Sequence, residues 1–129
     1  MIEKPLAAVS QFHKTYNLIE NENPTVAIPE AIKELRFELM KEENEEYLEA
    51  VKNNDIVEMA DALGDMLYIL CGTIITHGMQ DKIEAVFDEI QRSNMSKLGL
   101  DGKPIYRADG KVMKGPNYFK PNISKIMGD

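Results

Sequence analysis

The stretch that decides the fold is residues 56–70, Ile56-Val57-Glu58-Met59-Ala60-Asp61-Ala62-Leu63-Gly64-Asp65-Met66-Leu67-Tyr68-Ile69-Leu70. It is apolar on nearly all sides, which predicts a helix in the interior of the molecule or at an interface between subunits. Three acids interrupt it, and they share one narrow face because their spacing is i, i+3, i+7. Asp55 precedes the run as an N-cap and Gly78 supplies a stop signal, so we expect one helix from Asp55 to about His77.

Three further helices are expected around this one. Apolar residues at helical spacing predict them from Leu6 to Leu18, from Pro29 to Val51 and from Asp81 to Leu98. The tail beyond them differs in kind, because Asp109-Gly110 between two short apolar stretches predicts a tight hairpin. The sequence therefore predicts an all-α protein, with a helix bundle over residues 1–99. A basic extended or hairpin tail over residues 100–129 is expected to pack on the bundle or on a neighbouring subunit.

Charge is distributed unevenly along the chain. Residues 1–91 hold 7 Lys and Arg against 19 Asp and Glu, whereas residues 92–129 hold 8 against 3, so that balances of −12 and +5 give the net charge of −7. An acidic body argues against nucleic acid as a partner, since binding it requires a broad basic face. The distribution suits a small anionic ligand that travels with cations, such as a nucleotide with Mg²⁺.

The composition also predicts the cellular compartment of the protein. No apolar run reaches the roughly 20 residues that span a bilayer, and the N-terminus lacks the pattern of a signal peptide. The one cysteine, Cys71, lies in an apolar helical run and has no intrachain partner. We therefore expect a cytoplasmic protein that has no membrane partner.

Acidic residues occupy positions of the helix over residues 29–51 where the pattern predicts core. Glu43 and Glu46 project into the middle of its apolar stripe, and Glu42 lies at the edge of that stripe. Solvated glutamates with i,i+4 partners would produce the same composition. This helix alone therefore leaves both interpretations open.

The helix over residues 56–70 favours buried acids. Glu58 fits a capping box with Asp55, and Asp61 gains from the helix dipole in the early turns, but Asp65 has neither explanation. A carboxylate in a buried helix costs several kcal/mol unless it is paired or bound to a metal ion. The neighbouring helix offers Asp65 only more carboxylates.

Facing carboxylates repel unless a cation lies between them, which predicts a divalent metal site. Oxygen ligands without a nearby thiolate favour Mg²⁺, with Mn²⁺ as a substitute, over Zn²⁺. The chain has only two histidines, His13 and His77, and neither has the Glu-x-x-His spacing of a di-iron bundle. His13, next to Phe12, is instead a candidate for lining a base pocket.

The acidic positions carry a resemblance to a known superfamily. Glu42-Glu43-Asn44-Glu45-Glu46, followed by Glu58-Met59-Ala60-Asp61, resembles the E-E-x-x-E and E-x-x-D signature of the MazG-like all-α NTP pyrophosphatases. That superfamily includes MazG proteins, dimeric dUTPases and phosphoribosyl-ATP pyrophosphohydrolases. The resemblance spans about residues 6–98, and the tail is similar to that of a short single-domain branch.

Two features depart from the signature. Only 11 residues separate Glu46 from Glu58, which is short for the superfamily. In many relatives the final Asp directly precedes a Leu-Leu-Phe-like run, and by that criterion Asp65 would be the motif's acid and Ala62 would stand where a Glu is expected. We favour Glu58 and Asp61 as the motif, with Asp65 as an additional member of the same face.

The resemblance implies a four-helix bundle of the MazG-like type and Mg²⁺-dependent hydrolysis of an NTP or dNTP to the monophosphate and pyrophosphate. Glu42 would act as the general base for the attacking water. The full set of expected catalytic residues is Glu42, Glu43 and Glu46. The expected metal ligands are Glu43, Glu46, Glu58, Asp61 and Asp65. The preferred base stays open between purines such as dGTP and pyrimidines such as dUTP or dCTP.

Basic and aromatic residues are expected to complete the substrate site. The candidates for phosphate binding are Arg92, Lys97, Lys111 and Lys114. Tyr118 is a candidate for stacking on the base, although packing against the bundle explains it equally well.

Two alternative functions remain, and the assembly is predicted separately. A phosphoribosyl-ATP pyrophosphohydrolase would use the same acidic face on a different nucleotide, and the basic tail argues mildly against it. A non-catalytic helical dimerisation module is the other alternative, but it would gain stability by losing Asp65. Because the helix over residues 56–70 is apolar on more faces than one small bundle covers, we expect a homodimer or a dimer-of-dimers tetramer.

Overall fold

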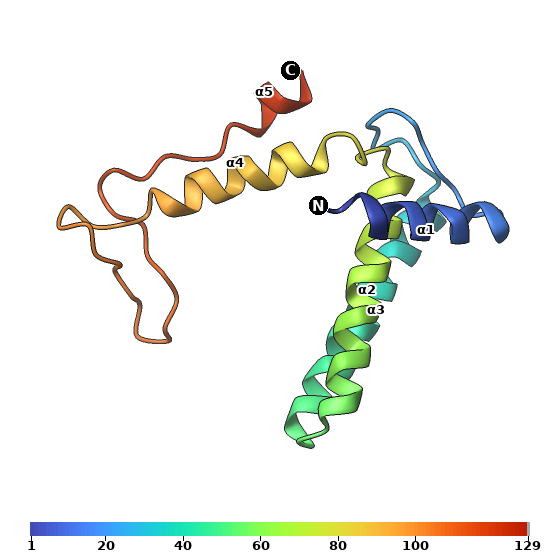
Figure 1. The fold of residues 1–129 in the computed structure, drawn as a ribbon, viewed down its shortest axis with the longest axis horizontal. Helices are drawn as coiled ribbons and strands as arrows, with labels where there is room; N and C mark the ends of the chain where they lie inside the picture. The colour runs from blue at the N-terminus through green and yellow to red at the C-terminus, as the bar shows by residue number, and fades with distance from the viewer. Residues whose placement is uncertain (129) are drawn as a thin grey trace. The chain divides into compact units, whose positions relative to one another are not determined.

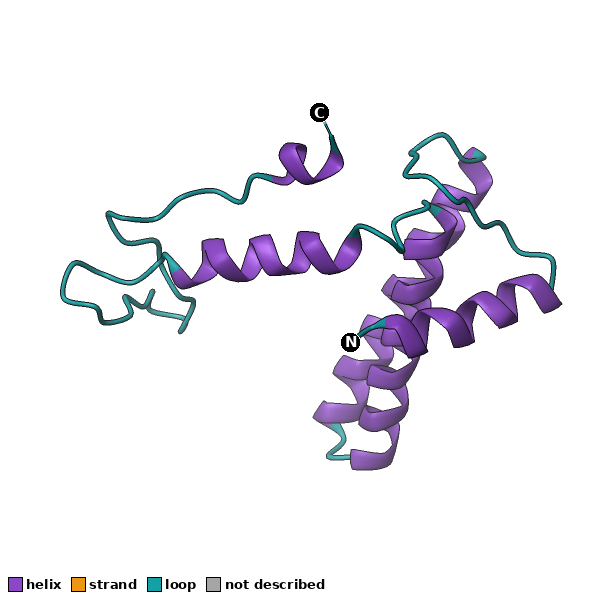
Figure 2. Ribbon diagram, turned by 45° about the horizontal axis from the view of Figure 1, so that its top comes forward, coloured by secondary structure: helices purple, strands orange, loops and turns teal. Residues whose placement is uncertain are grey.

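The structure is a computed structural model that describes residues 1–128. It divides into two compact units, one formed by residues 1–81 and the other beginning at Lys82. The helices of the first unit are α1 (Glu3–Thr15), α2 (Glu30–Lys52) and α3 (Ile56–Thr76), and those of the second are α4 (Ile83–Met95) and α5 (Ile123–Met127) (Figure 1). Within residues 1–128 the only extended pairing is a single bridge in the tail, so the predicted all-α class is confirmed (Figure 2).

α2 and α3 form an antiparallel hairpin, and the two helices run side by side (Figure 1). Asn54 makes the turn with a φ of +54°, and the N–H of Asp55 donates to the carbonyl oxygen of Ala50 at 2.9 Å. Asp55 then caps α3 as predicted, because its Oδ1 accepts from the backbone N–H of Glu58 at 3.0 Å. The hairpin places the acids of the two helices on facing surfaces.

α3 ends at a glycine whose backbone conformation no other residue adopts easily. Gly78 has a φ of +69°, and the N–H of Met79 donates to the carbonyl oxygen of Ile74 at 2.9 Å, which is a Schellman motif. A Cβ on Gly78 would lie 2.1 Å from the carbonyl oxygen of Asn23. The stop signal expected at this glycine is therefore confirmed.

The loop between α1 and α2 is tied to this end of α3. Asn21 donates from its backbone N–H to Ile75 and from its side chain to the carbonyl oxygen of Thr76, at 3.0 and 2.7 Å. The backbone N–H of Thr25 donates to the carbonyl oxygen of His77 at 2.9 Å, and Nδ1 of His77 donates to the carbonyl oxygen of Thr25 at 2.8 Å. These bonds fix the loop to the C-terminal end of α3.

The first unit has a small core, and much of α3 lies outside it. Its buried apolar residues are Leu6, Val9, Ile28, Ala50, Ala62, Cys71, Ile74 and Ile75. Ile56 and Val57 are 74% and 71% exposed, and Leu63, Leu67 and Leu70 are also exposed.

Contrary to the expectation that no apolar run is long enough to span a bilayer, α3 qualifies as a membrane-spanning helix by length and composition, and a third of its apolar window is buried among the described residues. Its carboxylates at Glu58, Asp61 and Asp65 would be costly in hydrocarbon.

In the second unit the chain folds back along α4 after a hairpin. Tyr106 bridges Val112, and Gly110 takes a φ of +89° in the turn, as the Asp109-Gly110 pair predicted. The Ser93 hydroxyl then donates to the carbonyl oxygen of Phe119 at 2.8 Å. The returning segment is thus fixed to α4.

The helix boundaries differ from the predicted ones in ways that local chemistry explains. α1 begins three residues earlier than expected, because Pro5 stands in a first turn that needs no backbone N–H partner. α5 was not predicted, because its five residues are too few for an apolar periodicity. Asn122 caps its start by accepting from the N–H of Lys125 at 3.3 Å. The compact units divide between Asp81 and Lys82, so α4 belongs with the tail. The assignment of residues 1–99 as the functional domain stays a prediction.

Candidate metal and nucleotide site

Four carboxylates gather where α2 faces α3. They are Glu43 and Glu46 from α2 and Asp61 and Asp65 from α3, and we refer to them as the acidic cluster. Each pair shares one face of its helix, because residues three or four apart lie one above the other. Glu43 and Asp65 are half-buried, whereas Glu46 and Asp61 are exposed.

Glu43 is the member of the acidic cluster whose negative charge is most disfavoured. Burial, the neighbouring Glu46 carboxyl and the negative charges of Asp65 and Asp61 together raise the pKa of Glu43 to about 7. Its Oε2 is buried and has no hydrogen-bond partner within residues 1–128. A buried carboxylate oxygen without a partner is costly, and a proton or a cation removes that cost.

The donor set fits a hard divalent cation, because all four groups are carboxylates. Their oxygens do not yet form a ligand set: within the described chain, no three His, Cys, Asp or Glu side chains are arranged to hold an ion. Like charges on facing helices repel each other. Binding an ion would therefore require the side chains to turn toward one another.

The remaining predicted acids lie outside this group. Glu42 is exposed on α2, next to Glu43 in the sequence. Glu58 is also exposed and stands in the first turn of α3, where its N–H is held by Asp55. Neither residue contributes to the raised pKa of Glu43.

Arg92, expected to bind phosphate, is engaged within the second unit. Its Nη2 and Nε donate to the two carboxylate oxygens of Glu89 at 2.8 and 3.0 Å, and its guanidinium carbon lies 4.3 Å from the centroid of the Phe119 ring. Glu89 also accepts from the N–H of Asn122 at 2.9 Å. These contacts hold the tail against α4.

The other predicted phosphate and base residues of the second unit are more open. Lys111 is exposed, and Lys97 is half-buried and accepts through its carbonyl from the N–H of Gly115 at 2.8 Å. Lys114 is exposed and its Nζ lies 4.8 Å from the ring centroid of Tyr118, which is half-buried. Within residues 1–128 no acidic side chain forms an ion pair with any of these three lysines.

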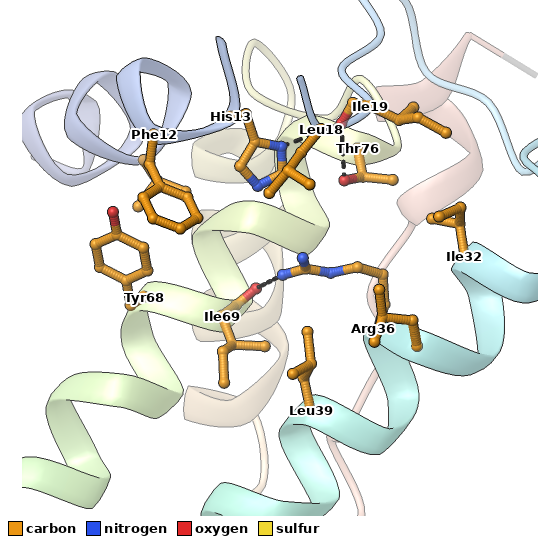
Figure 3. Close-up of a pocket in the computed structure, with 12 residues that line it drawn as sticks. Phe12, His13, Leu18, Ile19, Ile32, Arg36, Leu39, Tyr68, Ile69 and Thr76 are labelled. Atoms are coloured by element: carbon orange, nitrogen blue, oxygen red, sulfur yellow. Dashed lines mark hydrogen bonds between the residues drawn. The ribbon is translucent and has the colours of Figure 1, made fainter. Parts of the chain in front are cut away.

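His13, the predicted base-binding residue of the first unit, is buried and lines a cavity between α1, α2 and α3 (Figure 3). Arg36 lines the same cavity, and the sequence interpretation did not single it out. A signal was present, because Arg36 lies three residues before Leu39 and seven before Glu43, on the apolar stripe of α2. A charged residue on such a stripe requires an explanation just as the acids do.

Known proteins are similar to this chain over most of its length. The family described as phosphoribosyl-ATP pyrophosphohydrolase matches residues 9–94, which include all of α2 and α3. A protein of Acanthamoeba polyphaga mimivirus, "Uncharacterized protein L479", is 30% identical over 95 residues, and the match covers 70% of this chain but only 38% of the length of that curated relative.

A solved structure is also similar. It is that of a proposed NTP pyrophosphohydrolase from Exiguobacterium sp. 255-15, which is 27% identical, with 96% of this chain and 92% of that chain covered at a TM-score of 0.49. The assignment rests on the family match, which extends over most of the chain. The chain therefore belongs to the phosphoribosyl-ATP pyrophosphohydrolase family of the MazG-like all-α superfamily, whose members are hydrolases of nucleotide pyrophosphate bonds.

Proposed function

We propose that this protein is a Mg²⁺-dependent nucleoside triphosphate diphosphohydrolase that releases the monophosphate and pyrophosphate. The observation that carries the proposal is the buried Oε2 of Glu43, which has no hydrogen-bond partner within residues 1–128 and lies near three further carboxylates. A structural protein would lose stability by keeping such a group. A protein that binds a cation and an anionic substrate has a use for it.

The acidic cluster would hold the cation, with Glu58 as a further candidate because it shares the α3 face of Asp61 and Asp65. When bound, Mg²⁺ supplies positive charge that offsets the charge developing on the phosphate oxygens. Glu42 is open to solvent beside the cluster, where it would orient the attacking water and accept its proton. Mn²⁺ has similar ligand preferences and is the expected substitute.

The phosphates would be bound by Lys97, Lys111 and Lys114, since none of their ammonium groups is paired with an acid within residues 1–128. Arg92 would have to leave Glu89 to do so, which makes it the weakest of the four candidates. Tyr118 would stack on the base only if it exchanged its contact with Lys114 for one with the substrate.

The second candidate function is hydrolysis of phosphoribosyl-ATP, which the family match favours by its description. The same acidic cluster would serve that reaction, because the bond that breaks is again a phosphoric anhydride. The two functions differ in what the rest of the substrate requires, so turnover of each substrate distinguishes them.

We further infer that two or more copies assemble through the exposed apolar faces of α2 and α3. Phe37 is 65% exposed and Leu48 is 49% exposed on α2, in addition to the exposed residues of α3. Exposed apolar patches of this kind mark contacts between proteins. A homodimer or a dimer of dimers would cover them, and the molar mass from light scattering tests this directly.

The test of the proposed function is a panel of NTPs, dNTPs and phosphoribosyl-ATP, assayed for pyrophosphate with Mg²⁺. We expect release from at least one nucleoside triphosphate, and loss of turnover in Glu46→Gln and in Asp61→Asn while the helical circular dichroism is unchanged. Glu45→Gln, which removes an exposed charge from α2, is the control and should retain turnover. Full activity in both cluster variants would discard the proposal, and release of pyrophosphate from phosphoribosyl-ATP alone would favour the second candidate.

A further inference from the structure

A cavity of about 270 Å³ lies between α1, α2 and α3, and it differs from an ordinary packing defect in its polar groups (Figure 3). Most of its walls are apolar. Two nitrogen-bearing side chains face it, His13 from α1 and Arg36 from α2. Cavities with apolar walls and a few converging polar groups are typical of small-molecule sites.

Arg36 is a half-buried cation whose polar contacts are all with uncharged groups among residues 1–128. Its Nη2 donates to the carbonyl oxygen of Ile69 at 2.7 Å and its Nε to the hydroxyl of Thr73 at 3.0 Å. No carboxylate in residues 1–128 forms an ion pair with it, and Nη1 makes no hydrogen bond to any described residue. A guanidinium held in this way offers unused donors to whatever enters the cavity.

His13 supplies an acceptor beside those donors. The ring is 2% exposed, and its Nδ1 lies 3.1 Å from the carbonyl oxygen of Ile19, which only accepts. Nδ1 therefore carries the proton and Nε2 of the neutral ring carries a lone pair. Burial lowers the pKa of His13, and the charge of Arg36 acts in the same direction, whereas the Ile19 carbonyl and the charge of Glu20 oppose the shift.

Gly72 brings the two groups together. A Cβ on this residue would lie 2.5 Å from Nη2 of Arg36 and 3.0 Å from Nε2 of His13. The missing side chain of α3 therefore provides the space that a donor and an acceptor share.

Two aromatic rings stand at one side of this cavity. Phe12 and Tyr68 lie edge to face, with ring centroids 5.6 Å apart (Figure 3). Aromatic rings provide flat apolar surfaces for another planar ring. The cavity thus combines planar apolar contact with one donor and one acceptor.

The cavity and the acidic cluster lie at neighbouring levels of the α2–α3 hairpin. Arg36 precedes Glu43 by seven residues, which is two turns of α2 on one face and about 10 Å along its axis. On α3, Tyr68 follows Asp65 by three residues. A ligand that spans both would have a planar polar ring at one end and phosphates at the other.

We propose that this cavity binds the nucleobase of the substrate, an inference that rests on the proposed function. Arg36 donates to an acceptor atom on the edge of the base, and Nε2 of His13 accepts from the neighbouring N–H or amino group. Phe12 and Tyr68 contact the ring. The phosphates then point along α2 toward the acidic cluster.

The test measures binding without turnover. The four common nucleoside 5′-monophosphates, and ribose 5-phosphate as a probe without a base, are titrated calorimetrically into the full chain. We expect the best nucleotide to bind at least about 10-fold more tightly than ribose 5-phosphate, which is the ratio that one well-made polar contact supplies. Arg36→Lys keeps the charge but loses the planar fork, and it should reduce this ratio to near one.

Gly72→Ala and Gly64→Ala form a matched pair, because each adds one methyl group to α3 and each favours the helix. The methyl at Gly72 would displace the end of Arg36, whereas the methyl at Gly64 meets nothing within 4 Å. We expect a loss of about 10-fold in nucleotide affinity for Gly72→Ala and wild-type affinity for Gly64→Ala. Circular dichroism checks that both variants stay helical.

Several results would overturn the base pocket. They are equal affinities of Gly72→Ala and Gly64→Ala, selectivity that survives Arg36→Lys, and a best nucleotide that binds no more tightly than ribose 5-phosphate or does not bind. Selective binding without pyrophosphate release from any triphosphate would refute the hydrolase and leave the pocket standing. Pyrophosphate release with no base preference would refute the base pocket and leave the proposed hydrolase function standing.

Discussion

Replacing Glu43 by Gln is the sharpest test of the acidic cluster, because it removes one charge and keeps the shape. A pKa that moves from an ordinary value of 4.5 to about 7 corresponds to about 3 kcal/mol of preference for the protonated acid in the folded chain. Glu43 is only half-buried, and solvent screens its neighbours, so we expect about half of this, ~1.5 kcal/mol, as the gain in unfolding free energy at pH 8. For a chain of this size that is a rise of about 4 °C in melting temperature.

The gain should depend on pH with a definite sign. At pH 4 Glu43 is largely protonated in both the folded and the unfolded chain, so the substitution gains almost nothing. Between pH 4.5 and about 7 the unfolded chain loses this proton while the folded chain keeps it, and the wild type therefore loses stability as the pH rises. Above pH 7 the full penalty is present, and the advantage of Glu43→Gln should be constant.

Mg²⁺ should narrow the difference in stability between the wild type and Glu43→Gln. A cation that binds only the folded chain raises its melting temperature according to its affinity. At pH 8 we expect Mg²⁺ to stabilise the wild type and to have a smaller effect on Glu43→Gln. Scanning calorimetry at pH 4, 6 and 8 with and without Mg²⁺ measures all of this, with Glu45→Gln as the control for an exposed charge on the same helix. The reasoning would be refuted if Glu43→Gln gained as much unfolding free energy at pH 4 as at pH 8, or if Mg²⁺ stabilised the wild type and Glu43→Gln equally.

Two further substitutions test the structure around the site. Gly78→Ala should cost about 2–4 kcal/mol, because alanine disfavours a φ of +69° and its Cβ would meet the carbonyl oxygen of Asn23, and urea unfolding measures the loss. A cost below about 0.5 kcal/mol would show that this helix end is not held as described. Arg92→Gln should free the tail by breaking the ion pair with Glu89, and limited proteolysis after α4 should then be faster. We expect KM for the triphosphate to change less than 3-fold. A tail that stays resistant to proteolysis, together with a 10-fold higher KM, would instead indicate that Arg92 binds the phosphates.

The helices were predictable because their signals are local. Apolar periodicity and end signals such as Asp55 and Gly78 depend on residues within one or two turns, and the four long helices are present in the structure. The Asp109-Gly110 hairpin was predictable for the same reason, since its turn requires a glycine conformation.

The groups that are brought together by tertiary packing were harder to predict. Arg36 finds its partners on α3, 33 and 37 residues away, and no local pattern announces a cavity at that point. The engagement of Arg92 depends on Phe119 and Asn122, which return to α4 only after a long loop. A basic residue that looks available for phosphate in the sequence is thus already paired in the fold.

The choice among the acids of α3 was nevertheless contained in the sequence, through the length of the turn. Two antiparallel helices joined at Asn54 rise equally per residue, so a residue lying some number of positions before Asn54 faces the residue lying the same number after it. Glu43 lies eleven before and Asp65 eleven after, whereas Glu58 faces Ala50 beside the turn. The pairing is consistent with burial of both Ala50 and Ala62, the second of which faces Glu46. The register of the hairpin therefore favours Asp65 over Glu58 as the principal partner of Glu43, and Asp61 lies one turn from Asp65. It also gives a reason for an acid at position 65, which helix capping does not explain.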